Sequence, residues 1–156
     1  MKRAVEHRIG VQAPAEIVWE VVSEFDRWHE WNPLYVKAAG QLKIGTALTL
    51  EEAIGDRPVK VIQPIVQDWV PYEQLHWRSQ RLGGFVTAIR YLEVENMGDS
   101  NATFSNGELF MGMLVKWISK DERRALKAAF TAMGEAVRDR AEALWQARAA
   151  APSEVG

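Results

Sequence analysis

The chain begins with a regular alternation of apolar and polar positions. From Val5 to Val11 every second residue lies on one largely apolar side, which is the period of a half-buried β-strand. His7 falls on that side, between Val5 and Ile9. Two interpretations of His7 stay open: it is a core histidine with a hydrogen-bond partner, or it is a polar group that lines a ligand pocket.

A helix and an aromatic corner follow the first strand. Pro14 suits the first turn of a helix, and apolar residues recur at helical spacing from Ile17 to Phe25. We predict that this helix begins at Pro14 and ends in the segment Trp28-His29-Glu30-Trp31-Asn32-Pro33, because a residue before proline is displaced from the helical region. Trp28 and Trp31 are either a hydrophobic plug at this corner or the rim of a pocket.

The middle of the chain, from Leu34 to Met113, consists of short alternating runs separated by turn residues. The runs that predict strands are Leu48-Thr49-Leu50, Val59-Lys60-Val61, Leu75-His76-Trp77, 85–94 and 102–110. Parallel strands would need helical crossovers between them, and no helical period lies in this region. The pattern therefore predicts an antiparallel sheet.

A long helix is predicted at the end of the chain. Ser119 and Glu122 have the spacing of a capping box, and apolar residues then step by three and four, so that the helix should reach about Arg148. Its apolar stripe is assigned to the core and would also roof any cavity beneath the helix: Phe130, Met133 and Val137. The basic residues near its start are interpreted as solvated surface, because acidic residues lie among them: Lys120, Arg123, Arg124 and Lys127.

This order of elements predicts an α+β fold in which a curved antiparallel β-sheet wraps around a long C-terminal α-helix, with a short helix or helices after the first strand. Such a sheet tends to leave a cavity between itself and the helix. The length of 156 residues fits one domain with a substantial core. We assign residues 1–148 to a single domain and residues 149–156 to a flexible C-terminal tail.

The composition narrows the function classes. With 47% hydrophobic residues, 26% charged residues and a net charge of −2, the chain has neither the signature of disorder nor that of a nucleic-acid-binding protein. Seven tryptophans indicate a roomy aromatic interior. The absence of cysteine excludes disulfides, thiolate metal sites and cysteine nucleophiles, and fits the cytoplasmic location that we predict. Charges interrupt the chain too often for a signal peptide or a transmembrane segment.

Four phrases along the chain resemble the START-like SRPBCC superfamily, the helix-grip proteins that include polyketide cyclases/dehydrases, lipid-transfer domains and birch-pollen-allergen-like proteins. They occur in the expected order: Ala13-Pro14-Ala15-Glu16-Ile17-Val18-Trp19, then the corner from Trp28 to Pro33, then Leu75-His76-Trp77, and finally Asn106-Gly107-Glu108-Leu109-Phe110-Met111-Gly112. Together they extend over nearly all of residues 3–147.

The resemblance implies a helix-grip fold with a deep apolar pocket between the sheet and the C-terminal helix, and no universal catalytic set. Many relatives carry a histidine in the strand where this chain reads Thr87-Ala88-Ile89-Arg90-Tyr91. A role for that histidine is therefore not carried over to this chain.

Two carboxylates lie on the apolar side of predicted strands. Glu108 is either a polar group of the pocket or one half of an ion pair with Arg90 or Arg81, since a buried carboxylate is costly without a partner. The same two interpretations apply to Glu52.

The leading hypothesis is a protein that binds a small hydrophobic or amphipathic molecule, such as a lipid, an aromatic compound or a polyketide-like compound, in the predicted cavity. We assign to this site His7, Trp28, Trp31, Leu50, Trp77, Tyr91, Phe104, Glu108, Phe110, Phe130, Met133 and Val137.

Two alternatives stay open. One is a polyketide cyclase/dehydrase-like enzyme in which His7 or Glu108 acts as acid or base. The other is a protein-interaction module whose contact surface is an exposed apolar patch from Trp28 to Tyr35. No catalytic residue, metal ligand or cofactor is assigned, the expected partner is a small hydrophobic molecule and not nucleic acid, and the oligomeric state is left open.

Overall fold

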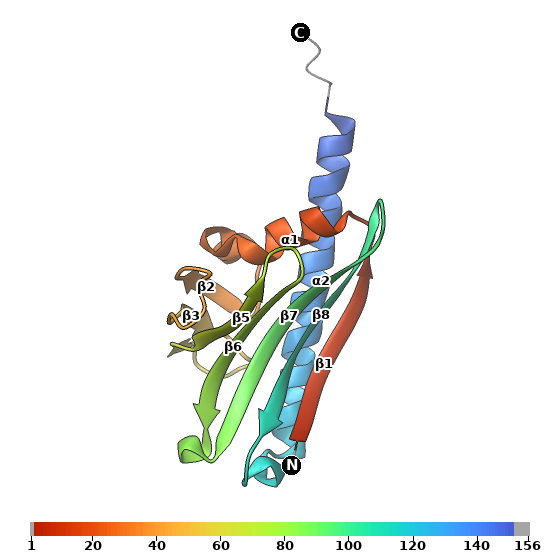
Figure 1. Ribbon diagram of the computed structural model, residues 1–156. Coiled ribbons are helices and arrows are strands. Elements are labelled where there is room, and N and C mark those ends of the chain that lie inside the picture. The colour runs from red at the N-terminus through yellow and green to blue at the C-terminus, as the bar shows by residue number, and fades with distance from the viewer. Residues whose placement is uncertain (1, 152–156) are drawn as a thin grey trace.

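A five-stranded antiparallel sheet forms one side of the computed structural model, which describes residues 2–151 (Figure 1). Its strands lie in the order β1-β8-β7-β6-β5. They are β1 (Lys2–Val11), β5 (Ile65–Val70), β6 (Gln74–Arg81), β7 (Val86–Gly98) and β8 (Asn101–Met111). Hairpin connections join β5 to β8 in sequence, and β1 pairs antiparallel with β8 at the edge. The predicted antiparallel sheet is confirmed.

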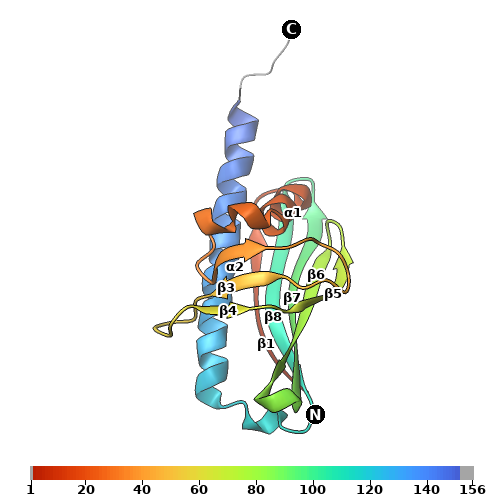
Figure 2. The same cartoon turned by 90° about the vertical axis from the view of Figure 1, so that its left-hand side faces the viewer.

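A smaller sheet continues the wall around the long helix (Figure 2). It contains β2 (Tyr35–Ala39), β3 (Thr49–Glu52) and β4 (Lys60–Ile62) in that order. One isolated bridge, between Ala47 and Ile65, ties it to the larger sheet. The ladder is interrupted near Pro64, which has no N–H to donate to a neighbouring strand. Both β2 and β5 lie outside the runs that predicted strands.

The long helix α2 (Lys120–Ala150) packs against β1 and β8. The Ser119 hydroxyl accepts a hydrogen bond from the Glu122 N–H at 3.0 Å, so the predicted N-cap is confirmed. The helix includes residues 149 and 150, which the sequence assigns to the flexible tail, and residues 152–156 lie outside the described residues. No helix in residues 2–151 is both long enough and apolar enough to cross a membrane.

The predicted first helix is divided into two. α1 (Ala15–Ser23) ends before the corner, and Phe25–Glu30 forms a separate 3₁₀ helix, η1. The chain breaks at Glu24, whose φ of −84° and ψ of 77° are not helical. Beyond the break, the Trp28 indole N–H donates to the Val22 carbonyl at 3.2 Å. The prediction that one helix reaches Trp28 is therefore wrong, because this contact folds the corner back onto the end of α1.

The space between the sheet and α2 is filled with side chains. The largest fully buried ones include Trp28, Tyr35, Arg90, Phe104 and Phe130. Arg90 does not line any of five surface hollows formed by residues 2–151. The sequence predicts an apolar cavity at this place, whereas the structure has a packed interior with a cation at its centre.

Candidate functional site

Arg90, in the middle of β7, is the centre of a buried polar site. Its side chain lies on the inward face of the sheet and is only 1% exposed. The guanidinium Nε donates to the Tyr35 hydroxyl at 2.9 Å, and Nη1 donates to the Gly107 carbonyl at 3.0 Å. Nη2 donates to the Asn106 side-chain oxygen at 2.8 Å. These contacts tie β7 to β2 and β8 through one side chain.

Aromatic rings surround the same guanidinium. Its central carbon lies 4.0 Å from the centroid of the Phe130 ring on α2. The rings of Tyr35 and Trp77 are farther away, with centroids at 5.7 and 6.0 Å. A cation over desolvated aromatic faces gains electrostatic attraction, and stacking suits the planar guanidinium better than an ammonium. The packing thus favours arginine at position 90.

The charge of Arg90 has no direct counter-ion. All of its hydrogen-bond acceptors are neutral, and within residues 2–151 no carboxylate oxygen lies within ion-pair distance of it. Removing a cation from water costs several kcal/mol unless an anion compensates it. A negatively charged or strongly polar ligand oxygen in contact with the guanidinium would supply the direct ion pair that its neutral acceptors do not.

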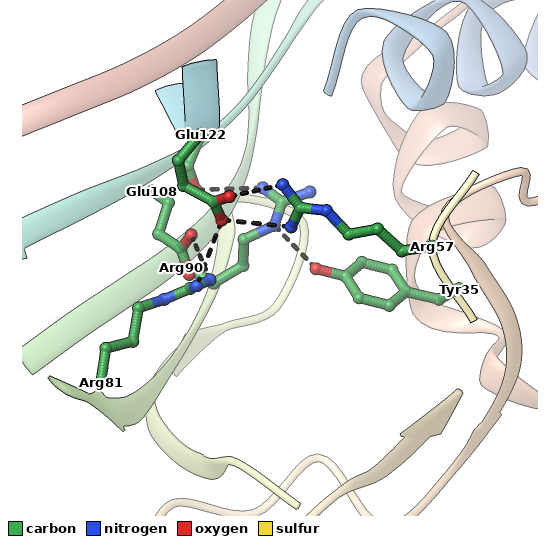
Figure 3. Close-up of polar contacts among 7 residues, drawn as sticks. Tyr35, Arg57, Arg81, Arg90, Glu108 and Glu122 are labelled. Carbon is green, nitrogen blue, oxygen red and sulfur yellow. Dashed lines mark hydrogen bonds and ion pairs between the residues drawn. The ribbon is translucent and has the colours of Figure 1, made fainter. Parts of the chain in front are cut away.

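A chain of ion pairs runs from the interior to the surface (Figure 3). Buried Glu108 of β8 accepts from Arg81 of β6 at 3.0 Å. Arg81 also lies 3.7 Å from Glu122, in the first turn of α2. Glu122 in turn accepts two hydrogen bonds from Arg57, in the loop between β3 and β4, one of them at 3.3 Å. We call Glu108, Arg81, Glu122 and Arg57 the ion-pair chain; it links β8 to the loop that faces α2.

Glu108 is therefore in the ion pair with Arg81 that the sequence left open. It also acts on a second carboxyl. Burial first, and then the charge of Glu108, raise the pKa of Glu52 above its usual value, while Arg81 and Arg90 oppose the shift. The charges of Glu108, Arg81 and Arg90 thus all act on the Glu52 carboxyl. Burial also raises the pKa of Tyr35, so its phenol keeps its proton at neutral pH.

His7 is separated from these carboxyls. It lies opposite Asn106 in the pairing of β1 with β8, and its ring packs against Gly134 of α2, where a Cβ would clash with Nδ1. That Nδ1 is buried and has no hydrogen-bond partner among residues 2–151. Burial, followed by the charge of Lys127, lowers the pKa of His7. The structure thus assigns His7 to the contact between β1 and α2.

The aromatic corner supports the site through Tyr35. Trp28 is fully buried, and its ring stacks on that of Tyr35 with centroids 5.6 Å apart. Trp77 meets the other side of Tyr35 edge-on at 5.5 Å. Half-buried Trp31 contacts only Trp28 of this group, at 6.1 Å. The corner therefore holds the phenol whose oxygen reaches Arg90.

The corner does not provide the exposed patch expected of an interaction module. Trp28 and Tyr35 are buried, and Trp31 is half-buried. The segment from Trp28 to Tyr35 therefore does not support the hypothesis of a protein-interaction module.

The other predicted site residues separate into two groups. Most belong to the buried hydrophobic core: Leu50, Phe104, Phe110, Phe130, Met133 and Val137. Met133 contributes its sulfur 3.4 Å from Arg90. Tyr91 lies on the outer face of the sheet, because it alternates with inward Arg90, and its ring meets His76. Burial raises the pKa of Tyr91 to about 12.

Sequence reasoning missed the two central members of the site. The sequence indicates Arg90 only as a possible ion-pair partner of Glu108, and Tyr35 only as the end of a possible contact surface. One signal was available, since Arg90 stands between the apolar Ala88 and Leu92 on the inward face. Tyr35 gave no comparable signal, because its role depends on β2 reaching β7 across the fold. No group of three or more His, Asp or Glu residues within 2–151 is arranged to hold a metal ion.

The chain is similar in sequence to one family of known proteins. The model of the family described as "Polyketide cyclase / dehydrase and lipid transport" matches residues 2–142. No curated protein sequence matches the chain significantly.

Solved structures share the fold at low sequence identity. The aromatase/cyclase ZhuI from Streptomyces sp. R1128 is 17% identical, with a TM-score of 0.68 over 99% of this chain and 100% of that chain. A START superfamily protein from Mycobacterium smegmatis is 17% identical, with a TM-score of 0.72 over 90% and 98%. Norcoclaurine synthase from Thalictrum flavum, in complex with dopamine and hydroxybenzaldehyde, is 15% identical, with a TM-score of 0.67 over 89% and 86%. These likenesses confirm the helix-grip fold.

Proposed function

The chain belongs to the polyketide cyclase/dehydrase and lipid-transport family, and from this premise we propose that it binds an amphipathic small molecule with an anionic or carbonyl oxygen directed at Arg90. Family membership supports a ligand-binding or cyclase role. The apolar part of the ligand would contact the aromatic core, and its oxygen would compensate the buried charge.

The observation that carries this proposal is the burial of Arg90 among neutral acceptors alone. A ligand carboxylate, phenolate or enolate would place a negative charge in direct contact with the guanidinium, in surroundings where charge-assisted hydrogen bonds are strong. A wholly apolar ligand would leave that charge uncompensated. We therefore favour acidic or carbonyl-bearing aromatic and lipid-like compounds over plain hydrocarbons.

Access would lie beside the ion-pair chain. A hollow of about 300 Å³ separates α2 from the segment after β3, and it is lined by Pro33, Leu34, Ala53, Gly55, Ala125, Ala128, Ala129 and Ala132. Arg57 and Glu122 join the same two elements. Because the interior is packed, uptake requires this loop to move away from α2 and the core side chains to rearrange.

The test combines extraction with matched probes. Denaturing mass spectrometry of a solvent extract from the purified protein should reveal a bound acidic or carbonyl compound. In thermal-shift measurements a fatty acid or aromatic carboxylate should raise the melting temperature more than the alcohol of the same skeleton. If no compound is extracted and no probe of either kind raises the melting temperature, the proposal is wrong.

A pair of arginine variants locates the binding site. Arg90→Met should weaken binding of the carboxylate at least about tenfold, since hydrogen bonds to charged groups contribute about 1.5–3 kcal/mol. Arg78→Met is the matched control, because Arg78 is exposed on the outer face of β6. Equal effects of the two variants would exclude Arg90 as the ligand's partner.

As a second function we propose proton transfer at a carbon next to a carbonyl group, of the kind that a cyclase or dehydrase requires. The observation that favours it is that burial and the charge of Glu108 raise the pKa of Glu52 and so bring that carboxyl nearer to neutral pH. Glu52 would take the proton as general base, and Arg90 would stabilise the enolate oxygen.

Hydrogen–deuterium exchange tests this second function separately from binding. In deuterated water the protein should accelerate exchange at the central carbon of a β-diketone such as benzoylacetone, followed by NMR, and Glu52→Gln should abolish the acceleration. If the protein binds the β-diketone but does not accelerate the exchange, this enzymatic function is excluded, and a carrier or sensor function is left.

A further inference from the structure

Large apolar side chains are exposed at the end of the molecule where β6 meets β7 and β8 leads into α2. Leu82 and Phe85 are 45% and 56% exposed, and Met113 and Trp117 are 80% and 71% exposed. The first two lie in or beside the 3₁₀ helix η2 (Leu82–Gly84), and Trp117 ends the 3₁₀ helix η3 (Val115–Trp117). We call these four residues the apolar tip.

The two loops that carry the apolar tip are neighbours. Gly112 approaches Phe85 so closely that a Cβ at this position would clash with the Phe85 carbonyl. Figures 1 and 2 both place the two loops at one end of the molecule, beside the start of β1. The loops that carry the exposed side chains therefore lie together at one end of the molecule.

Leu82 adopts an unfavourable backbone conformation there. Its φ of 49° lies in the left-handed region, where a leucine is disfavoured and asparagine or glycine is preferred. Its exposed side chain gains little from burial within this chain. Neither the backbone nor the core of the protein accounts for an apolar residue at this position.

The charge around the apolar tip is mainly positive. Exposed Lys2 begins β1, Lys116 lies within η3, and Lys120 begins α2. Within residues 2–151 none of these lysines is within ion-pair distance of a carboxylate. Of the nearby acidic residues, Asp121 pairs with Arg124 and Glu122 with Arg57 and Arg81, so the unpaired charge at this end is positive.

We propose that the apolar tip and these lysines dock the protein on an anionic lipid surface. Tryptophan, phenylalanine, leucine and methionine can insert at the boundary between headgroups and acyl chains, while lysines bind the headgroups. The exposed apolar residues lie on two neighbouring loops beside exposed lysines, and this combination of apolar and positively charged groups matches an anionic lipid surface. This inference does not depend on the interior site around Arg90.

Vesicle flotation of the full chain tests the proposal. The protein should float with phosphatidylcholine vesicles that contain about 30% phosphatidylserine, and at least about tenfold less with phosphatidylcholine alone. Raising the salt concentration to about 0.5 M should weaken the binding, because salt screens the lysines. The double variant Lys116→Glu/Lys120→Glu should also lose binding, and glutamate is favourable at the start of a helix, so α2 should remain folded.

Apolar variants separate insertion from simple charge attraction. Trp117→Ala/Met113→Ala should reduce vesicle binding at least about tenfold. Met97→Ala/Val61→Ala, at exposed positions away from the tip, is the matched control and should bind as the wild type does. Leu82→Asn should weaken binding without lowering the melting temperature, since asparagine tolerates a positive φ.

The overturning results are equally specific. If the wild type does not float with anionic vesicles at low salt, the tip serves no lipid surface, and a protein partner becomes the remaining explanation. Equal loss of binding in the tip variant and the control variant would also overturn the proposal. Full vesicle binding by Trp117→Ala/Met113→Ala would overturn the proposal as well, because attraction between the lysines and the headgroups would then be sufficient.

Discussion

At the scale of single residues, the Tyr35 hydroxyl is critical because it accepts a hydrogen bond from the buried Arg90 at 2.9 Å. Tyr35→Phe removes this acceptor and keeps the ring that packs against Trp28 and Trp77. A buried charged donor is then unpaired, so the free energy of unfolding should fall by about 1–3 kcal/mol. Urea denaturation at neutral pH measures this change.

Tyr91→Phe provides the control for the same chemical change. Tyr91 lies on the outer face, and within residues 2–151 its hydroxyl forms no hydrogen bond with a side chain or carbonyl group. This variant should change the free energy of unfolding by less than about 0.5 kcal/mol. Similar losses in both variants would mean that the Arg90 contact contributes nothing specific.

At the scale of elements, the contact between β1 and α2 depends on a glycine in the middle of a helix. Gly134→Ala would favour the helix by about 1 kcal/mol, but its Cβ would meet the His7 ring. We expect a net loss of stability of about 1–3 kcal/mol from the clash. In a His7→Ala background the same substitution should instead stabilise the protein by up to about 1 kcal/mol.

A double-mutant cycle by chemical denaturation measures this coupling. The opposite signs in the two backgrounds are the decisive result. If Gly134→Ala destabilises both backgrounds equally, His7 is not the reason for the glycine.

The elements differ in how much of them the sequence could predict. The alternation in β1 and the Ser119 cap depend on local residues, and both appear in the structure as predicted. The break between α1 and η1 could not be predicted from helical spacing, because it accompanies a return contact from Trp28 to Val22. Likewise, a capping box predicts that Glu122 turns back to Ser119, but its carboxylate binds Arg57 and Arg81 from distant elements.

The candidate site likewise combines features that local sequence determines with features that depend on contacts between distant elements. The inward position of Glu108 follows from strand alternation, and the sequence correctly limited its ion-pair partner to Arg81 or Arg90. The choice between the two depends on the register of β6, β7 and β8, which local sequence does not encode. The cavity was predicted from the layout of sheet and helix and from the resemblance to relatives, whereas the large side chains of this particular core decide how much of that space is filled.

At the scale of the whole molecule, Glu52 makes stability depend on pH. Its pKa in the folded state is raised by burial and by Glu108, so the folded protein binds its proton more tightly than the unfolded chain does. The stabilisation from this carboxyl is complete below the unfolded pKa of about 4.3 and is lost as pH rises through the folded value. Glu52→Gln should therefore be more stable than the wild type at pH about 8, and the difference should vanish near pH 4.

Denaturation series across this range measure the difference. Glu51→Gln removes the same formal charge from the adjacent position of β3 and controls for net charge. A stabilisation of Glu52→Gln that persists unchanged at low pH would show that proton binding is not its cause.

Ligand exchange also belongs to the whole molecule, since the proposed access route requires the loop after β3 to separate from α2. Arg57 and Glu122 join these elements through partly exposed side chains, and such a pair contributes at most about 1 kcal/mol. Arg57→Ala should therefore accelerate both association and dissociation of a fluorescent aromatic anion, anilinonaphthalene sulfonate, by up to about fivefold. The dissociation constant should change little, because Arg57 lies outside the interior site. Stopped-flow fluorescence measures both rates. The matched control is Arg124→Ala, at an exposed position in the first turns of α2. Unchanged rates in Arg57→Ala would exclude this route, whereas a changed dissociation constant with an unchanged association rate would place Arg57 in direct contact with the probe.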